Sequence, residues 1–168
     1  DESGKVDALI ALLYSRGKGF ESDLVDGEWT SVLSRQGKNS PRIQKVVEKT
    51  ETDKTAENIF DTKTLTFSGI TYTPHHRGML KSFVSYNPTS EGFDKSINGN
   101  IVVRRIMCDI TGASFKYWKF PTLPLPLKKK GGYLDFVFMD QDIRVTRGNR
   151  GGLFVHFRPA FLEKVLKE

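Results

Sequence analysis

The second half of the chain constrains the fold most, because short strand-like segments follow one another there with no helix-like segment between them. Runs rich in Val, Ile, Thr and aromatic residues alternate with Gly, Pro, Asn and Asp, as strands alternate with turns. The predicted strands are 64–72, 78–86, 100–106, 114–120, 133–139, 142–147 and 153–157. Parallel strands need a crossover connection, usually a helix, so this pattern predicts an antiparallel sheet.

The first third and the last few residues of the chain follow a different pattern. Apolar side chains recur at helical spacing in residues 5–14, which predicts a helix that ends near Gly17. Further expectations are an extended stretch over 26–33, a short helix over 42–48, a loop over 50–57 and a helix over 159–166.

A long series of antiparallel strands must hide its edges, and an up-and-down barrel does so economically. The gaps Met139–Asp142 and Gly148–Gly151 are short enough for hairpins. A chain of 168 residues suits one domain. We therefore expect a mainly β fold in a single domain, 1–168. Its parts are an N-terminal helix and linker (1–23), an antiparallel β-barrel (24–158) and a C-terminal helix (159–168).

Charge is distributed unevenly along the chain. Residues 101–168 hold 13 basic and 6 acidic side chains, giving +7, whereas the first 100 residues are close to neutral. A basic half can attract nucleic acid, anionic lipid or an acidic protein face. No apolar stretch approaches the roughly 20 residues that span a bilayer, so we expect any membrane contact to be peripheral. The chain begins at Asp1 rather than Met, so we expect an upstream segment that either has been removed or lies before the residues shown in the sequence.

Residues with catalytic or metal-binding chemistry are better explained as structural. His75 and His76 are adjacent in a Pro- and Gly-bounded turn, without the spacing of a metal site. Asp140 and Asp142 straddle a predicted turn, where Asp caps its own backbone. The single cysteine, Cys108, excludes an intramolecular disulfide and reads as a small core side chain. We therefore expect no enzyme activity and no metal.

Nucleic-acid binding is also disfavoured. Arg104 and Arg105 could contact phosphates, and Phe115, Tyr117 and Trp118 could stack on bases. No recognised nucleic-acid-binding signature accompanies them, so a solvated basic face and aromatic core side chains are the favoured interpretation.

A Pro- and Leu-rich segment, residues 120–127, is a candidate docking element. Its three prolines are incompatible with a central strand, yet large apolar side chains remain on an extended backbone. The segment is either an exposed docking patch or a loop folded across one barrel end. A cationic run follows directly, which suits a membrane surface or an acidic partner. The candidate docking residues are Leu123, Leu125, Leu127, Lys128, Lys129 and Lys130.

Three stretches together resemble the plastid lipid-associated proteins, also called fibrillins. Residues 9–17 (LIALLYSRG) resemble the opening helix and Arg-Gly turn of that family, and 24–29 (LVDGEW) resembles the start of its first strand. Residues 140–155 (DQDIRVTRGNRGGLFV) resemble its C-terminal signature, the most specific of the three. The linker between Gly17 and Leu24 is shorter than is usual in the family.

The resemblance implies a lipocalin-like barrel in the chloroplast, peripheral on the thylakoid membrane or the plastoglobule. It implies a non-enzymatic protein that binds membrane lipids, a prenylquinone or a pigment such as a carotenoid. An alternative is a structural or linker subunit with a filled barrel, docked on a photosynthetic membrane protein complex.

The residues of the family motif have a structural interpretation. Gly27 lets the chain turn sharply into the barrel, and Trp29 plugs that end. An arginine of the signature, for which Arg147 is our candidate, is expected to stack on the indole of Trp29. The motif residues are Gly27, Trp29, Asp142, Arg144, Arg147, Gly148, Gly151 and Gly152.

Candidate ligand-binding residues come from the alternation of side chains along strands. Leu134, Phe136 and Phe138 are predicted to share one face of their strand. The same reasoning pairs Leu65 with Phe67, and Met79 with Phe83. These seven side chains either line a pocket in the barrel or fill it.

Overall fold

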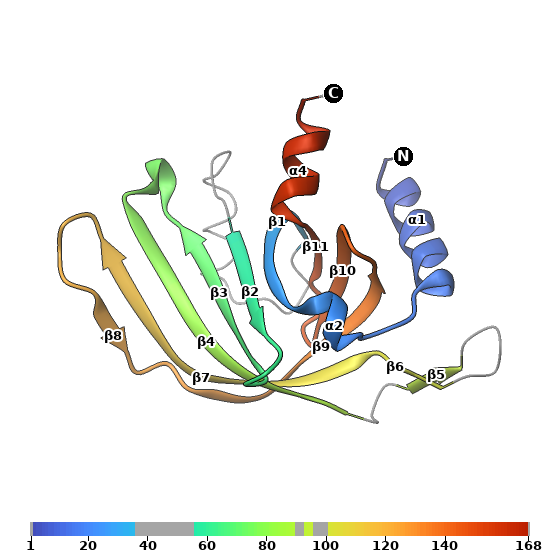
Figure 1. Cartoon of the computed structure of the whole chain (residues 1–168), viewed down its shortest axis with the longest axis horizontal. Helices are drawn as coiled ribbons and strands as arrows, with labels where there is room; N and C mark the ends of the chain where they lie inside the picture. Colours follow the sequence, from blue (N-terminus) through green and yellow to red (C-terminus); the bar gives the residue numbers. More distant parts are fainter. Residues whose placement is uncertain (1, 36–55, 90–92, 96–100, 168) are drawn as a thin grey trace.

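The strands close into an eight-stranded antiparallel barrel with short helices at both ends of the chain, which confirms the expected fold class. The computed structural model describes residues 2–35, 56–89, 93–95 and 101–167 (Figure 1). In chain order the elements are α1 (Glu2–Arg16), α2 (Ser22–Val25), β1 (Gly27–Arg35), β2 (Ala56–Asp61), β3 (Thr66–Tyr72), η1 (Pro74–His76), β4 (Gly78–Pro88), β5 (Phe93–Lys95), β6 (Ile101–Val103), β7 (Arg105–Tyr117), β8 (Leu123–Leu125), β9 (Lys129–Met139), β10 (Ile143–Gly148), β11 (Leu153–Phe157) and α4 (Pro159–Val165).

Strand order explains how the barrel closes. Neighbouring strands run β4-β3-β2-β1-β11-β10-β9-β7, and β7 pairs back with β4. Every pairing in this ring is antiparallel. The strands β9, β10 and β11 follow one another as hairpins, as the two short gaps predicted. A separate two-stranded sheet is formed by β5 and β6.

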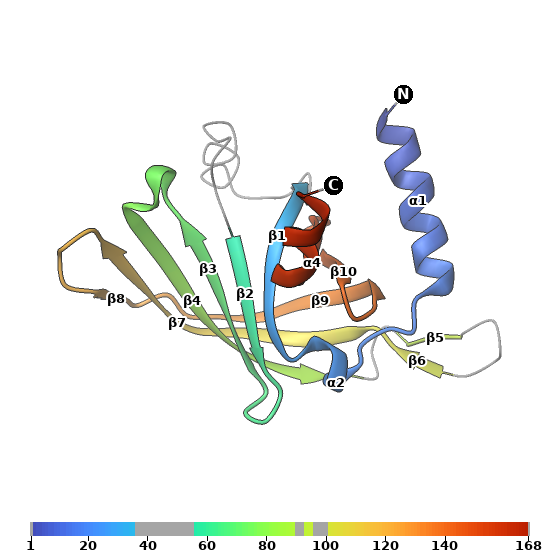
Figure 2. The same ribbon diagram turned by 45° about the horizontal axis from the view of Figure 1, so that its top comes forward.

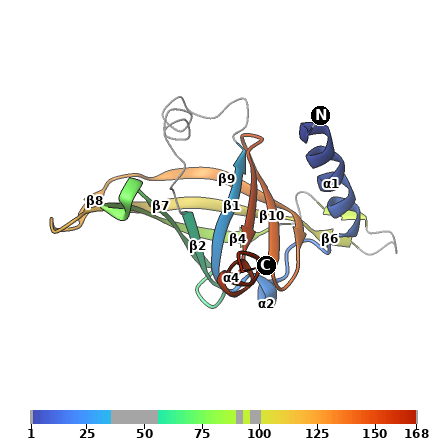
Figure 3. The ribbon, with the colours of Figure 1, turned by 90° about the horizontal axis from the view of Figure 1, so that it is seen from above.

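Two long strands carry the sheet beyond the ring. β4 and β7 pair from Gly78↔Tyr117 to Pro88↔Ile106. Along the other edge of β7, the pairing with β9 reaches only to Ile110, and β8 takes that place from Ala113 onward. This extension, which we call the wing (residues 78–83 and 111–130), projects from the barrel on the side away from α1 (Figures 2 and 3).

The structure differs from the predicted strands in two respects. Residues 100–106 and 114–120 were expected to be separate strands, but Arg105–Tyr117 is one strand. The register of its pairing with β9 shifts between Cys108 and Ile110, which marks a bulge. The polar and small residues at this bulge are of the kind that usually ends a strand, so the sequence suggested a boundary there. Strands β2, β5 and β8 were not predicted, and the first two residues of β2 fall in the expected loop. The expected helix over 42–48 lies outside the described residues.

Two apolar clusters occupy opposite sides of the sheet. The interior core consists of Val25, Trp29, Phe60, Tyr86, Ile106, Phe136 and Met139. A second cluster of Val137, Val145 and Leu153 lies outside the ring, where Ile10 and Leu13 of α1 pack on it. The register of the β9–β10 pairing shifts between Val145 and Thr146. Because of this shift, Phe136 of β9 belongs to the interior core, whereas its neighbour Val137 belongs to the outer cluster.

Arg104 fastens α1 to the barrel. Its guanidinium donates to the carbonyls of Tyr14 and Gly17 on one side, both at 3.1 Å. On the other side it donates to the carbonyls of Phe136 and Val137 at 3.3 and 3.1 Å. The carbonyls in the last turn of a helix have no partner within the helix and need such donors. The buried side chain of Arg104 therefore hydrogen-bonds both the end of α1 and strand β9.

We expect Gly17→Ala to lower the free energy of unfolding by about 1–3 kcal/mol. A Cβ at this position would press on the carbonyl oxygen of Val137 and lie 3.3 Å from Nη1 of Arg104. The matched control is Gly4→Ala, because a Cβ at Gly4 meets nothing within 4 Å. That control should stabilise the helix by about 1 kcal/mol or less. Urea unfolding followed by circular dichroism measures both, and equal midpoints would contradict the predicted close contact.

Candidate functional site

Trp29 seals one end of the barrel. Its side chain is fully buried, and its indole N–H donates to the carbonyl of Val25 at 2.8 Å. Phe20 lies edge-on to Phe136 at 5.1 Å between ring centroids, beside the same core. Gly27 has a φ of 87°, a conformation in which glycine carries no penalty. Trp29 therefore closes this end of the barrel with a fully buried side chain.

Two arginines lie over Trp29, and neither is Arg147. Arg158 lies 3.9 Å from the ring centroid and donates to the carbonyls of Leu24 and Glu28 at 2.6 and 3.0 Å. Arg144 lies 5.1 Å from the same ring. The expectation for Arg147 was wrong because side chains alternate along β10, so Arg144 is buried while Arg147 faces solvent. Arg158 was missed, although its place just after the last predicted strand puts it at a barrel end.

The remaining motif residues shape turns. Asp140 accepts hydrogen bonds from the backbone N–H groups of Asp142 and Ile143 at 2.8 and 2.7 Å, which confirms the turn interpretation. In the next hairpin, Gly148 donates to the carbonyl of Gly152 at 2.9 Å and Gly151 has a φ of 77°. A Cβ at Gly152 would lie 3.0 Å from the ring of Phe154. These residues hold β9, β10 and β11 in register.

A polar cluster lies inside the barrel, formed by Asn58, Arg144 and His156. Arg144 is 1% exposed, donates from Nη2 to Oδ1 of Asn58 at 2.7 Å, and lies 4.9 Å from the ring centroid of Phe60. Its Nε and Nη1 have no hydrogen-bond partner among the described residues. Burial and the neighbouring Arg158 lower the pKa of Arg144 to about 9. We call this group the interior polar cluster.

His156 faces Arg144 across the β10–β11 pairing. It is buried, and its Nδ1 has no partner among the residues that the structure describes. Burial, with a smaller effect of the charge on Arg144, holds the pKa of His156 well below its usual 6.5. His156 is therefore neutral at physiological pH.

Acidification should destabilise the protein through His156. Below about pH 6.5 the unfolded chain binds a proton that the folded chain does not, so the free energy of unfolding falls as the pH drops. The slope from this one group is at most about 1.4 kcal/mol per pH unit. His156→Gln should remove that slope, whereas His76→Gln, at an exposed turn, should keep it. Thermal unfolding between about pH 6.5 and pH 4.5 measures the difference, and superimposable profiles for all three proteins would refute it.

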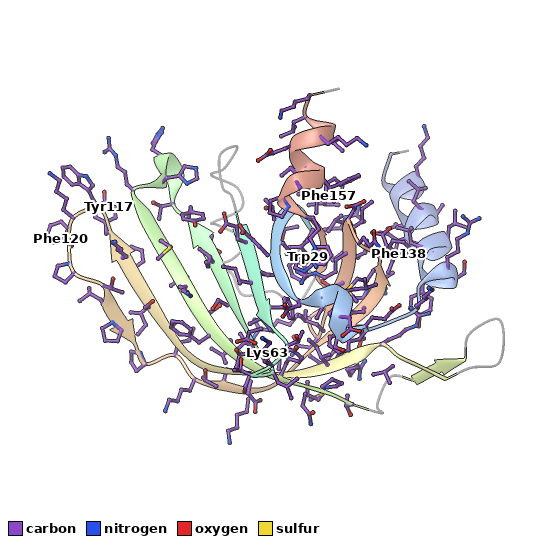
Figure 4. All side chains as sticks on the ribbon, viewed as in Figure 1. Trp29, Lys63, Tyr117, Phe120, Phe138 and Phe157 are labelled. Carbon is purple, nitrogen blue, oxygen red and sulfur yellow. The ribbon has the colours of Figure 1, made fainter. Side chains whose placement is uncertain are left out.

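The predicted ligand-binding residues fall into three places. Phe136 belongs to the interior core, and Phe67 and Leu134 pack against it. Phe67 stacks on Phe60 at 4.6 Å between ring centroids. Phe138 does not share their face, because the register shift turns it outward beside α1 (Figure 4).

The other three predicted residues lie away from the interior core. Leu65 is at the turn before β3, with a φ of 53°, and is exposed. Met79 and Phe83 alternate with the interior side chains of β4, so they lie on the outer face of the wing, where Lys81 lies over the Phe83 ring. Alternation pairs residues correctly along one strand, but it does not say which face is inward.

The inner face of the wing is apolar and continues the inner face of the barrel. Leu80 of β4 pairs with Phe115 of β7, which pairs with Leu123 of β8. Tyr117 and Leu125 extend the same face, and the rings of Phe115 and Tyr117 stack at 6.4 Å. Leu123 is 58% exposed and Tyr117 43%. Alternation over 113–117 is the sequence signal that could have found this face.

The tip and rim of the wing combine aromatic and cationic side chains. Trp118 and Phe120 are 65% and 64% exposed, and Phe120 lies at the far end of the wing from α1 (Figure 4). The wing holds no acidic residue, and its basic residues are Lys81, Lys116, Lys119, Lys128, Lys129 and Lys130. Leu123, Leu125 and Leu127 are exposed on an edge strand and the loop after it. The Pro- and Leu-rich segment is therefore an exposed edge, and its interpretation as a loop across a barrel end is wrong.

Other sequence candidates have structural surroundings. His75 and His76 form a short 3-10 turn, as expected. Cys108 packs against the interior core, and burial raises the pKa of its thiol to about 12. Within 2–35, 56–89, 93–95 and 101–167, no group of three or more His, Cys, Asp or Glu side chains could hold a metal ion. Helices in the same ranges are too short or too polar to cross a bilayer.

Comparison with known proteins yields one match. The family model described as PAP_fibrillin matches residues 16–156, which include the barrel strands up to, but not including, the last residue of β11 and exclude most of α1 and all of α4. No curated protein and no solved structure matches the chain.

Proposed function

This chain belongs to the PAP_fibrillin family, and on that premise we propose that it holds an apolar molecule along the inner face of its barrel and wing. Members of the family are generally non-enzymatic structural or lipid-associated proteins of plastids. The proposed occupant is a lipid, a prenylquinone or a carotenoid. The proposed location is the surface of the thylakoid membrane or the plastoglobule.

The exposed inner face of the wing is the observation that carries this proposal. Large apolar side chains lie there on neighbouring strands, and no described helix or strand covers them: Leu80, Tyr117, Leu123 and Leu125 are exposed and Phe115 is half-buried. A monomer in water rarely leaves such side chains contiguous and uncovered unless they bind something. An apolar ligand would cover this face and continue toward the interior core.

Charge on the wing favours an anionic lipid surface as the docking partner. The wing carries six lysines, and no acidic side chain offsets them within it. Trp and Phe suit the boundary between head groups and acyl chains, and lysines next to them gain from negative surface potential. The tip residues Trp118 and Phe120 would enter the lipid surface, which would bring the inner face of the wing to the membrane.

Extraction of the native protein tests the proposal. The protein is purified gently from its source and extracted with organic solvent, and the extract is identified by mass spectrometry and absorption. One lipid, quinone or carotenoid per chain is the expected result. An empty extract, together with co-purification of a photosynthetic membrane complex, would overturn it in favour of a structural subunit with a filled barrel.

A further inference from the structure

We infer that the interior polar cluster of Asn58, Arg144 and His156 is a head-group site for the carboxylate of a long-chain amphiphile. This inference rests on the proposed function, because it names the class of molecule that the same barrel would hold. It assigns Arg144 to ligand recognition rather than to packing alone.

The first argument is the missing counter-charge. Arg144 is almost fully buried, and no described carboxylate forms an ion pair with it. Besides burial, Arg158 lowers the pKa of Arg144 and Arg144 lowers the pKa of His156, and no carboxylate acts on either group. Taking an ion out of water is strongly unfavourable unless a partner compensates its charge. A bound anion would supply that partner.

The second argument compares Arg144 with two other arginines. Arg104 donates to four backbone carbonyls, and Arg158 donates to two while it lies over Trp29. Both use their donors to hold parts of the chain together. Arg144 donates to the amide of Asn58 alone, and two of its three nitrogens donate to nothing among the described residues. A purely structural arginine would be expected to use its donors as Arg104 and Arg158 do.

The third argument concerns the shape and charge of the head group. The guanidinium lies over the rings of Trp29 and Phe60. A ligand would therefore accept hydrogen bonds from the N–H groups at the edge of the guanidinium, in its plane. A planar carboxylate matches donors arranged in a plane and carries the compensating charge. A neutral alcohol or carbonyl would accept a hydrogen bond but leave the cation uncompensated. Phe67 and Leu134 lie against the same core and offer apolar surface to the chain.

Binding of matched ligands to the delipidated full chain tests the inference. Oleate and oleyl alcohol share one hydrocarbon chain and differ in the head group, and they are titrated at about pH 8, where a carboxylate is ionised. The expected result is at least about tenfold tighter binding of oleate, as for a hydrogen bond to a charged group. Arg144→Met should weaken oleate binding at least about tenfold and oleyl alcohol binding much less, so the preference for oleate should disappear. Arg147→Met, at an exposed position of the same strand, should leave both affinities unchanged.

A second variant keeps the test decisive if Arg144→Met folds poorly. Asn58→Asp puts a carboxylate where the amide of Asn58 already accepts a hydrogen bond from Arg144. This carboxylate supplies the counter-charge from within the chain, so the variant should have a higher thermal midpoint than the wild type. It should also bind oleate at least about tenfold more weakly. Unchanged oleate binding in this variant would overturn the inference.

The outcomes separate the inference from the proposed function. If neither oleate nor oleyl alcohol binds, the proposed function fails and the inference falls with it. If both bind equally to the wild type, and Arg144→Met changes nothing, the head-group site is refuted while the apolar binding face stands. If oleyl phosphate binds more tightly than oleate and loses that affinity in Arg144→Met, the assignment to a carboxylate is overturned.

Discussion

Replacing Trp29 with Ala is expected to lower the free energy of unfolding by about 3–5 kcal/mol, the usual cost of truncating a fully buried aromatic side chain. The substitution removes the side chain that seals the barrel, together with its hydrogen bond to Val25. It also removes the ring over which Arg144 and Arg158 lie, so two cations lose an aromatic contact. A cavity next to a buried guanidinium relaxes poorly, which places the expected loss in the upper part of the range.

Trp118→Ala is the matched control, since it deletes the same side chain from an exposed site. Its effect on stability should stay within about 0.5 kcal/mol. Urea unfolding followed by far-ultraviolet circular dichroism measures both variants without depending on tryptophan emission. A Trp29→Ala midpoint close to that of the control would show that the barrel end is not sealed as described.

Neutralising three lysines of the wing should weaken binding to anionic vesicles about a hundredfold. Each lysine near a negative membrane surface contributes about 1 kcal/mol, so Lys128→Gln, Lys129→Gln and Lys130→Gln together remove about 3 kcal/mol. All three side chains are exposed, so the fold should not change. Co-sedimentation with phosphatidylglycerol-containing vesicles measures the affinity, and pure phosphatidylcholine vesicles give the uncharged baseline.

The control is a second triple variant with the same change in net charge. Lys5→Gln, Lys164→Gln and Lys167→Gln alter exposed residues at the two ends of the chain, away from the wing (Figure 1). This variant should bind vesicles nearly as well as the wild type. An equal loss in both triples would mean that net charge, rather than the wing, attracts the membrane.

These two predictions test opposite ends of one structure. The end at Trp29 is packed and holds two arginines at fixed positions, whereas the wing leaves apolar side chains uncovered beside a cluster of lysines. A head-group site near the packed end and an apolar face leading from it toward the wing would orient an amphiphile with its chain outward. Such a ligand could enter and leave where the wing meets a lipid surface.

Much of the fold could be predicted from sequence. Alternation and turn residues predicted β3, β4, β9, β10 and β11 close to their observed bounds, and the two short gaps predicted the last hairpins. The long strand β7 was divided in two because Asp109 and Gly112 lie near its bulges. Such residues end a strand in most sequences, but here the partner strands on both sides keep the chain extended.

The candidate site was harder to predict. The Pro- and Leu-rich segment was singled out from its composition, but its exposure depends on β8 being an edge strand next to β7, and its docking role stays a prediction. The interior polar cluster joins Asn58 of an unpredicted strand with Arg144 and His156 of two predicted ones. No local pattern links residue 58 to residue 144, because they meet only after the ring has closed.

By itself, the sequence determined most of the strands, their antiparallel pairing at the C-terminal end, the terminal helices and the family to which the chain belongs. These properties depend on side-chain periodicity and on turn residues, which act over a few neighbouring positions. Only the tertiary structure decided that Arg144 and Arg158 lie over Trp29, that Phe138 faces outward, and that the wing leaves its inner face exposed. The physical reason is that strand alternation defines two faces without naming either as the interior. A single bulge exchanges those faces, and closure of the ring then decides which of them is removed from water.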